Sequence, residues 1–217
     1  MQRIWAAAAA GQGWAGKVPV QPAQEAELEA LCGSPDHQGV CAQVAPYPYV
    51  LAHELLDAPD AIVLCLDQVQ DPHNLGAVCR VAECAGVAGV VVPERRSAAI
   101  TPAVCKASAG AVEHLRVARV RNVADYLSQA KAAGAWVYGA SGAGAGAVSY
   151  TEPDYRGRLV LVLGSEGEGL RPRVASACDA LVALPLRGRI ESLNVSTAAA
   201  ALVYGILHLR SALDRAP

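Results

Sequence analysis

From residue 61 onward, short apolar runs rich in β-branched residues alternate with segments of helical pattern. Residues 61–69 open with a continuous apolar run typical of a buried strand, and residues 75–86 have the periodicity of a helix. Further strand-like runs lie at 87–93, 159–164 and 180–185, followed by a long helical segment at 193–213. Because strands that alternate with helices pair in parallel and need cover on both faces, this pattern predicts an α/β fold with a mainly parallel sheet flanked by helices.

Residues 1–50 differ in composition, because they are rich in alanine, glycine, glutamine and proline. Within them only residues 24–32 have a helical pattern. A chain of 217 residues is long enough for one substantial domain with a small appendage. We therefore divide the sequence into a reduced N-terminal segment and linker at 1–50 and an α/β domain at 51–217.

The seven cysteines are an odd number, and no two of them form a C-x-x-C pair. This spacing supports neither a zinc ribbon nor a redox motif, so no metal site is predicted. Cys65 and Cys105 lie in apolar runs, where a free thiol behaves as a small hydrophobic group. Reduced thiols indicate a cytoplasmic protein.

No apolar run reaches the ~20 residues that span a bilayer, so no membrane partner is expected.

The formal net charge of −2 argues against a general nucleic-acid coat protein. Nevertheless, 15 of the 18 basic residues are arginine. The planar guanidinium group suits phosphate better than the point charge of lysine does, although codon bias alone can also give this composition. The arginines come in tight groups: Arg95 with Arg96; Arg116, Arg119 and Arg121; Arg156 with Arg158; Arg171 with Arg173; and Arg187 with Arg189.

The string GAGAGA at 142–147 superficially resembles the dinucleotide-binding fingerprint after a strand. That fingerprint requires a helix whose N-terminus holds the pyrophosphate. The residues YTEP at 150–153 break any helical pattern within a few positions. We therefore interpret the string as a flexible surface loop and disfavour a nicotinamide-dependent enzyme.

Three other segments carry more information. In the first, 66–80, a strand ends in polar residues, turns at Asp-Pro and enters a helix that carries Asn74 and Arg80. Taken alone, Asn74 is more often a helix cap and Arg80 more often a salt-bridge partner. In the second, 161–170, three glycines interleave with two glutamates directly after a buried strand. Glycine lets the backbone approach a ligand closely, and open α/β sheets bind ligands at the carboxyl ends of strands.

The third segment, 184–200, reads as a strand, a basic turn and polar residues that open an alanine-rich helix. Either Ser192 or Asn194 could be explained as the N-cap of that helix alone. The motifs in the three segments are D-P-x-N-L-G-A-x-x-R at 71–80, L-G-x-E-G-x-G at 163–169 and P-x-x-G-x-x-x-S-L-N-V-S at 185–196.

Together, in this order and spacing, the three motifs resemble the SpoU (TrmH-type) family of RNA ribose 2′-O-methyltransferases over residues ~61–210. The resemblance implies a C-terminal deep trefoil knot, S-adenosylmethionine as the cofactor, a structured RNA substrate and a homodimer. HQGVCAQV at 37–44 looks like the segment that precedes the catalytic domain in the branch that methylates a guanosine of large-subunit ribosomal RNA. Only 36 residues precede His37, too few for the usual N-terminal RNA-recognition module, so residues 1–50 would hold its remnant.

The resemblance also implies roles for individual residues. The cofactor would be held by the backbone around Leu163, Gly164, Gly167, Leu184, Ile190 and Leu193. The reacting ribose would be surrounded by Asn74, Arg80, Glu166, Ser192 and Asn194. RNA phosphates would be contacted by Arg95, Arg96, Arg116 and Arg187. In the family Arg80 would activate the hydroxyl, but a guanidinium is a poor base, so it could instead stabilise the alkoxide as it forms.

Two alternatives remain open beside the ribosomal RNA enzyme. A transfer-RNA ribose methyltransferase would share the chemistry, and the reduced N-terminal segment does not separate it from the ribosomal branch. A catalytically idle RNA-binding paralogue is disfavoured because the site residues are all present.

Overall fold

The computed structural model describes residues 19–142, 146–165, 167 and 169–213. The chain divides into two compact units, residues 1–47 and 48–217. In the first unit, helix α2 (Glu25–Cys32) ends at Gly33, whose left-handed backbone (φ 63°) lets its N–H bond the carbonyl of Glu29 at 2.8 Å. None of the residues of α2 is buried, so this helix has no core of its own.

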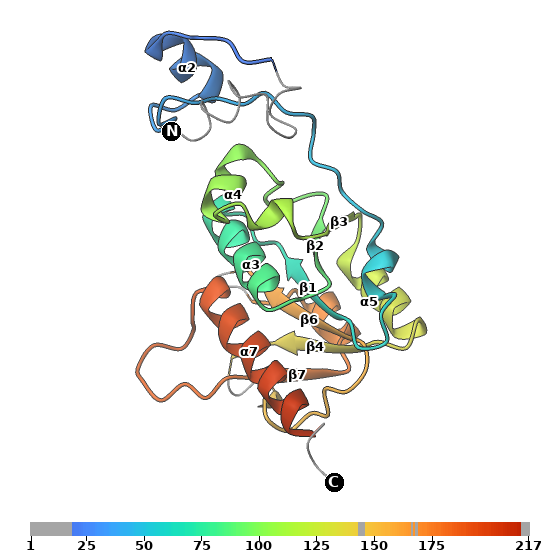
Figure 1. Ribbon diagram of the computed structural model, residues 1–217. Helices are drawn as coiled ribbons and strands as arrows, with labels where there is room; N and C mark the ends of the chain where they lie inside the picture. The colour runs from blue at the N-terminus through green and yellow to red at the C-terminus, as the bar shows by residue number, and fades with distance from the viewer. Residues whose placement is uncertain (1–18, 143–145, 166, 168, 214–217) are drawn as a thin grey trace. The chain divides into compact units, whose positions relative to one another are not determined.

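The second unit is built on a seven-stranded sheet with the order β3-β2-β1-β6-β4-β7-β5 (Figure 1). Every pair of neighbouring strands is parallel, which confirms the mainly parallel sheet that the alternation predicts. The strands are β1 (Ile62–Asp67), β2 (Gly89–Pro93), β3 (Val117–Val120), β4 (Trp136–Ala140), β5 (Val148–Ser149), β6 (Leu159–Gly164) and β7 (Ala180–Ala183). Strand β6 is inserted between β1 and β4, although β4 precedes it in the chain.

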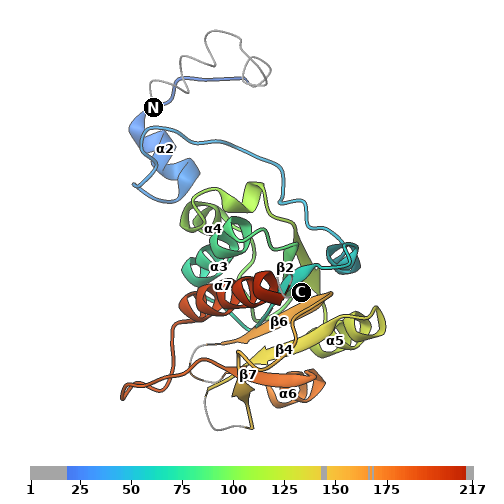
Figure 2. The same ribbon diagram turned by 60° about the horizontal axis from the view of Figure 1, so that its bottom comes forward.

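Helices cover both faces of this sheet (Figure 2). The longer helices are α3 (Pro72–Cys84), α5 (Val123–Ala132) and α7 (Val195–Leu213); the shorter ones are α4 (Pro102–Ala107), α6 (Pro172–Ala177), η2 (Ala52–Leu56) and η3 (Ala111–Glu113). Helix α3 packs against α4 and α7 on one face, while α5 packs against α6 and η2 on the other. The central strands β1 and β6 are therefore buried on both sides, which explains their nearly continuous apolar sequences.

Helix α7 is the one helix of the described segments with the length and apolar composition to cross a membrane. Polar residues such as Thr197 and His208 interrupt it, so its sequence contains no unbroken apolar run of ~20 residues. Within the fold, Leu202, Val203 and Ile206 are buried, and the helix packs against α3 and β6. This packing accounts for the apolar composition of α7.

Arg210 of α7 binds the loops that lead into the two central strands. Its Nη1 donates to the carbonyl of Asp60 at 2.6 Å, just before β1, and its Nε donates to the carbonyl of Tyr155 at 2.7 Å, before β6. At the outer edge of the sheet, the N–H of Val50 donates to the carbonyl of Val117 at 3.0 Å. The segment before η2 therefore covers part of the exposed edge of β3.

Candidate active site

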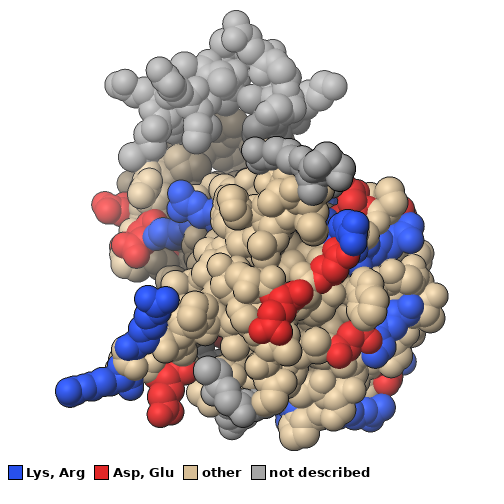
Figure 3. Space-filling view, turned by 90° about the horizontal axis from the view of Figure 1, so that it is seen from below, with Lys and Arg blue, Asp and Glu red and all other residues tan. Residues whose placement is uncertain are grey.

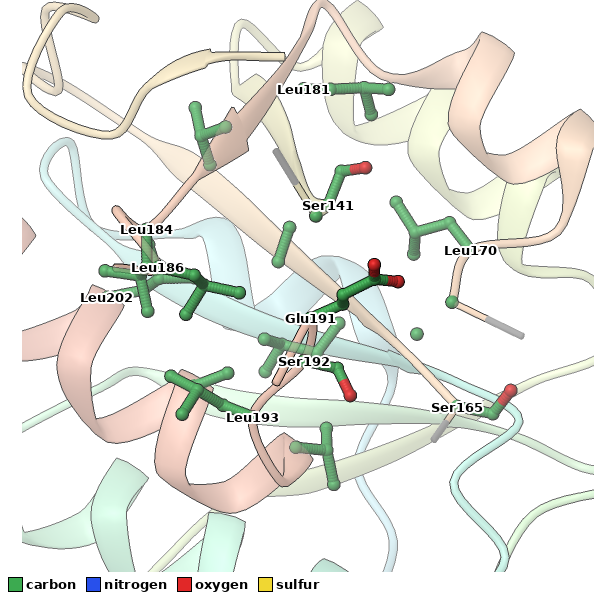
Figure 4. A pocket seen from close by; sticks show the side chains of 18 of the residues that line it. Ser141, Ser165, Leu170, Leu181, Leu184, Leu186, Glu191, Ser192, Leu193 and Leu202 are labelled. Atoms are coloured by element: carbon green, nitrogen blue, oxygen red, sulfur yellow. The ribbon is translucent and has the colours of Figure 1, made fainter. Parts of the chain in front are cut away.

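A pocket of about 570 Å³ lies at the carboxyl ends of β4, β6 and β7 (Figure 4). Its described lining residues come from these strand ends, the loop after β6, the loop between β7 and α7, the start of α7, and α6. They are Ala140, Ser141, Gly142, Leu163, Gly164, Ser165, Gly167, Gly169, Leu170, Ala175, Leu181, Val182, Leu184, Leu186, Glu191, Ser192, Leu193, Val195, Ala198 and Leu202. The volume falls within the ~300–1,000 Å³ of small-molecule sites.

The glycine-rich loop after β6 folds back on itself. Ser165 and Gly169 exchange two backbone hydrogen bonds, of 3.1 and 3.0 Å. A Cβ atom on Gly164 would lie 2.2 Å from the carbonyl carbon of Gly169, so only glycine permits this approach. Gly167 and Gly169 have φ angles of 84° and 69°, in the left-handed region that favours glycine. Loop closure therefore gives the dense glycines a structural reason in addition to ligand contact.

The end of this loop is fixed to β1 by a buried ion pair. Asp67, fully buried and paired in register with Gly164, accepts from the backbone N–H of Arg171 at 3.0 Å and from its Nε at 2.8 Å. Nη2 of Arg171 lies 2.6 Å from the same carboxylate. The sequence offered Arg171 only as one member of an arginine group, and here its guanidinium neutralises a buried charge.

The first and third motifs meet in one hydrogen bond. Nδ2 of Asn194 donates to Oδ1 of Asn74 at 2.9 Å, and Asn74 is 9% exposed in the first turn of α3. Oδ1 of Asn194 accepts from the backbone N–H of Ser196 at 2.8 Å, so Asn194 also caps α7. Helix α3 is capped by Asp71, which accepts from the N–H of His73 at 2.9 Å. Asn74 is therefore not the cap of its helix.

Arg80 lies further along α3 and is exposed. Its position is six residues after Asn74, about 9 Å along the helix axis. Among the described residues no acidic side chain forms an ion pair with Arg80. The described residues therefore give no support to a role of Arg80 as a salt-bridge partner. Arg80 and Asn74 do not line the pocket.

The pocket contains five of the six residues expected to hold the cofactor: Leu163, Gly164, Gly167, Leu184 and Leu193. The sixth, Ile190, is 77% exposed and does not line the pocket. Of the residues expected around the ribose, Ser192 lines the pocket, whereas Asn194 reaches α3 instead. Glu166 lies outside the described residues.

Sequence reasoning missed the contribution of β4. Ser141 and Gly142 follow this strand and line the pocket, although the string that begins at Gly142 was interpreted as a surface loop. Residues 143–145 of that string lie outside the described residues. The available signal was the position of Ser141 and Gly142 at the carboxyl end of a strand, where α/β sheets bind ligands. Leu170, Leu181, Leu186 and Glu191 were missed as well.

The four arginines expected to contact phosphate do not all lie at the carboxyl ends of the strands. Arg95 and Arg96 follow the carboxyl end of β2, and Arg187 follows that of β7; all three are exposed. Arg116 precedes β3 at the opposite edge, where it donates to the carbonyls of Ala88 and Glu54 at 3.3 Å each. On the face shown in Figure 3, basic side chains are scattered among acidic ones and form no single patch.

The buried Cys79 and the half-buried Cys178 are not suited to nucleophilic catalysis. Burial raises the pKa of the Cys79 thiol to about 12 and that of Cys178 to about 11, so both stay protonated at neutral pH. All seven thiols are free. No group of three or more metal-ligating side chains occurs in the described part of the chain.

Similarity to known proteins agrees with this geometry. A family model described as the SpoU rRNA Methylase family matches residues 61–204, which include the whole pocket. The chain belongs to the SpoU/TrmH family of RNA methyltransferases. A second model, described as RNA 2′-O ribose methyltransferase substrate binding, matches residues 5–50.

Relatives of this family are similar over most of the chain. A Staphylococcus saprophyticus protein assigned to the TrmH family of tRNA/rRNA methyltransferases is 38% identical over 200 residues, which are 90% of this chain and 79% of the relative. An uncharacterized tRNA/rRNA methyltransferase of Synechocystis is 42% identical over 188 residues, which are 84% of this chain and 48% of the relative.

Solved structures of family members have the same fold. The SpoU methyltransferase AviRb of Streptomyces viridochromogenes, in complex with AdoMet (S-adenosylmethionine), superposes with a TM-score of 0.68 and 25% identity over 76% of this chain. An AdoMet-bound rRNA methyltransferase of Sinorhizobium meliloti superposes with a TM-score of 0.69 and 29% identity over 74% of this chain. The chain spans 63% and 61% of these two proteins, less than two thirds of each.

The family depends on S-adenosylmethionine. The pocket fits this cofactor in chemistry as well as in size, because most of its lining side chains are apolar, while glycines at the carboxyl ends of β4 and β6 let a ligand approach the backbone. Backbone groups of this kind can recognise the edges of an adenine or a ribose.

Proposed function

We propose that this protein methylates a ribose 2′-hydroxyl of RNA, specifically that of a guanosine in large-subunit ribosomal RNA. The observation that carries the proposal is the convergence of the three motifs. The glycine-rich loop and the loop before α7 form one pocket, and the bond between Asn194 and Asn74 joins that pocket to α3. The segment at 37–44 supports the ribosomal branch.

When bound, S-adenosylmethionine supplies an electrophilic methyl group. The backbone around Leu163, Gly164, Gly167, Leu184, Ile190 and Leu193 would hold it, although Ile190 must move from its exposed position to take part. Ser192, at the pocket wall, and the pair of Asn194 with Asn74 would orient the ribose. Ser192 would contact the ribose from the pocket, and the pair of Asn194 with Asn74 would contact it from the side of α3.

We assign to Arg80 the stabilisation of negative charge that develops on the 2′-oxygen as its proton leaves. A guanidinium is always protonated, so water or another group accepts the proton. Glu166 would lie beside the same ribose. The ribose would then bind over the junction of α3 and α7, between Arg80 and the pocket.

RNA binding would depend on both units. The family match to residues 5–50 supports the assignment of the N-terminal segment as a remnant RNA-recognition module. Arg95, Arg96 and Arg187 are exposed at the pocket edge of the sheet and would contact phosphates. Arg116 would contribute a weaker contact, since its guanidinium already donates to two carbonyls at the other edge.

A transfer-RNA substrate is the second candidate. The names of the relatives give tRNA and rRNA together and so do not separate the two substrates, and a tRNA-modifying TrmH/SpoU enzyme of A. aeolicus has a similar fold. That enzyme superposes with a TM-score of 0.64 and 26% identity, over 73% of this chain and 79% of its own.

Three further properties belong to the proposal. We infer a trefoil knot in the region after Gly164, supported by the crossing of β6 and β7 to opposite sides of β4. We infer a homodimer in which α7 takes part, supported by its exposed Tyr204 (51%) and Leu213 (41%). The free thiols support a cytoplasmic location.

The test is to incubate the protein with methyl-labelled S-adenosylmethionine and total RNA and to map the label. Label on the 2′-oxygen of a guanosine in large-subunit ribosomal RNA is expected. Label in transfer RNA would establish the second candidate, and label on a base would overturn the ribose assignment.

A further inference from the structure

The described part of the pocket wall carries little charge. Most of its described side chains are apolar or absent, and three carry a hydroxyl group: Ser141, Ser165 and Ser192. Glu191 is the one charged side chain among the described lining residues, and no arginine or lysine of those ranges lines the pocket. An acidic group in such surroundings selects for charge on the ligand.

The side chain of Glu191 points into this cavity. Figure 4 shows its carboxylate in the middle of the pocket, between Ser141 and Leu170. Its backbone lies near the carboxyl end of β4, since its carbonyl oxygen lies 3.9 Å from where a Cβ atom on Gly142 would be. No described residue forms an ion pair with the carboxylate. Its charge is therefore available to a ligand.

We propose that Glu191 makes the pocket prefer the positively charged sulfonium of S-adenosylmethionine over the neutral thioether of its demethylated product. The proposal rests on the cofactor of the family occupying this pocket. The two ligands share the adenosine and the amino-acid group, and they differ in the methyl group and its positive charge. A carboxylate near the sulfur would therefore attract the substrate and release the product more readily after methyl transfer.

The test measures dissociation constants by titration calorimetry for S-adenosylmethionine, S-adenosylhomocysteine and sinefungin, in which a carbon bearing an ammonium group replaces the sulfonium. Glu191→Gln keeps the shape of the side chain and removes its charge. We expect this variant to raise the dissociation constants of S-adenosylmethionine and sinefungin about tenfold, which is the size of one modest charge interaction. The dissociation constant of S-adenosylhomocysteine should change by less than about twofold. Glu113→Gln, an exposed glutamate on η3, is the charge-matched control and should change none of the three.

Wild-type protein gives a second readout that needs no variant. Its preference for S-adenosylmethionine over S-adenosylhomocysteine should narrow as salt is raised from about 0.05 to 0.5 M, because ions screen the carboxylate. A substrate-to-product affinity ratio that is unchanged in Glu191→Gln and indifferent to salt overturns the proposal, as does an equal loss for all three ligands. Wild-type protein that binds none of the three would instead refute the assignment of the cofactor itself.

Discussion

The carboxylate of Asp67 binds both the backbone N–H and the guanidinium of Arg171, 104 positions later in the chain. Asp67 is fully buried, whereas the side chain of Arg171 is 43% exposed. The two partners therefore differ in what their removal leaves behind. Without Arg171 a buried charge keeps one backbone donor, but without the carboxylate the guanidinium can turn to water.

This asymmetry predicts unequal effects on stability. Arg171→Ala should lower the free energy of unfolding by about 3 kcal/mol, toward the cost of an uncompensated buried charge, and Asp67→Asn by clearly less. The double variant should be more stable than Arg171→Ala alone. Urea titrations of the full chain measure all three. The control is Arg173→Ala, whose pair with Asp125 is exposed (76% and 59%) and should contribute less than ~1 kcal/mol. Equal losses in the two single variants would contradict the argument.

Asn194 performs two tasks that substitution can separate. Serine at this position keeps an N-cap acceptor but is too short to reach Asn74. We expect the free energy of unfolding of Asn194→Ser to stay within ~0.5 kcal/mol of the wild-type value, and that of Asn194→Ala to fall by ~1 kcal/mol. Both variants should lose methylation turnover. Thermal unfolding and single-turnover methylation give the two readouts. Full turnover in Asn194→Ser would show that the contact with Asn74 has no part in the reaction.

The glycine-rich loop should not tolerate a side chain at its base. In Gly164→Ala the new methyl group would lie 2.2 Å from the carbonyl carbon of Gly169, which forces the loop open. We expect at least a tenfold loss of affinity for S-adenosylmethionine by calorimetry. Gly188→Ala is the matched control in the other loop of the site, because its nearest neighbour is 4.0 Å away and its φ is not positive. Similar affinities in the two variants would refute the packing argument.

Arg80 should affect the chemical step and not the binding of the cofactor. Arg80→Ala is expected to reduce turnover by about 10²–10³, the usual effect of losing one donor to a developing oxyanion. Its affinity for S-adenosylmethionine should stay unchanged, because Arg80 does not line the pocket. Single-turnover rates at saturating RNA make the measurement. Wild-type turnover in the variant would remove Arg80 from the site.

Thiol reactivity should follow burial. Alkylation requires the thiolate, and burial raises the pKa of Cys79 to about 12, so little thiolate forms below that pH. Cys84, in the last turn of the same helix, is exposed. Mass spectrometry after iodoacetamide treatment at pH 8 should find Cys84 modified first, with Cys79 reacting only as the pH approaches 12 or the chain unfolds. Prompt labelling of Cys79 in folded protein would mean that α3 opens readily.

The sheet was predictable from the sequence because its central strands are buried on both faces and so read as unbroken apolar runs. The order of the strands was not. Nothing local in residues 159–164 indicates that this strand is inserted between β1 and β4, because pairing depends on contacts distant in sequence.

The site was predictable to the extent that glycines and polar residues mark strand ends. The glycines after β6 indicated a ligand-binding turn, whereas Leu163 and Ser192 were assigned to the site only through the resemblance to the SpoU family; Leu163, Gly164 and Ser192 all line the pocket. Ser141 was missed because its neighbours lack a motif. Ile190 was expected to hold the cofactor, but it is exposed and does not line the pocket. The partner of Asp67 could not be found at all, since an arginine that binds buried charge and one that binds RNA look alike in sequence.

Helix α7 supplies one wall of the pocket with Val195, Ala198 and Leu202, and it follows every strand of the sheet in the chain. A ribosome that synthesises this protein therefore releases all seven strands before it releases the segment that completes the binding site. The sheet can begin to assemble during translation, but the wall that α7 supplies is added only after all seven strands have been made. A nascent chain that has not yet reached α7 therefore has an open pocket.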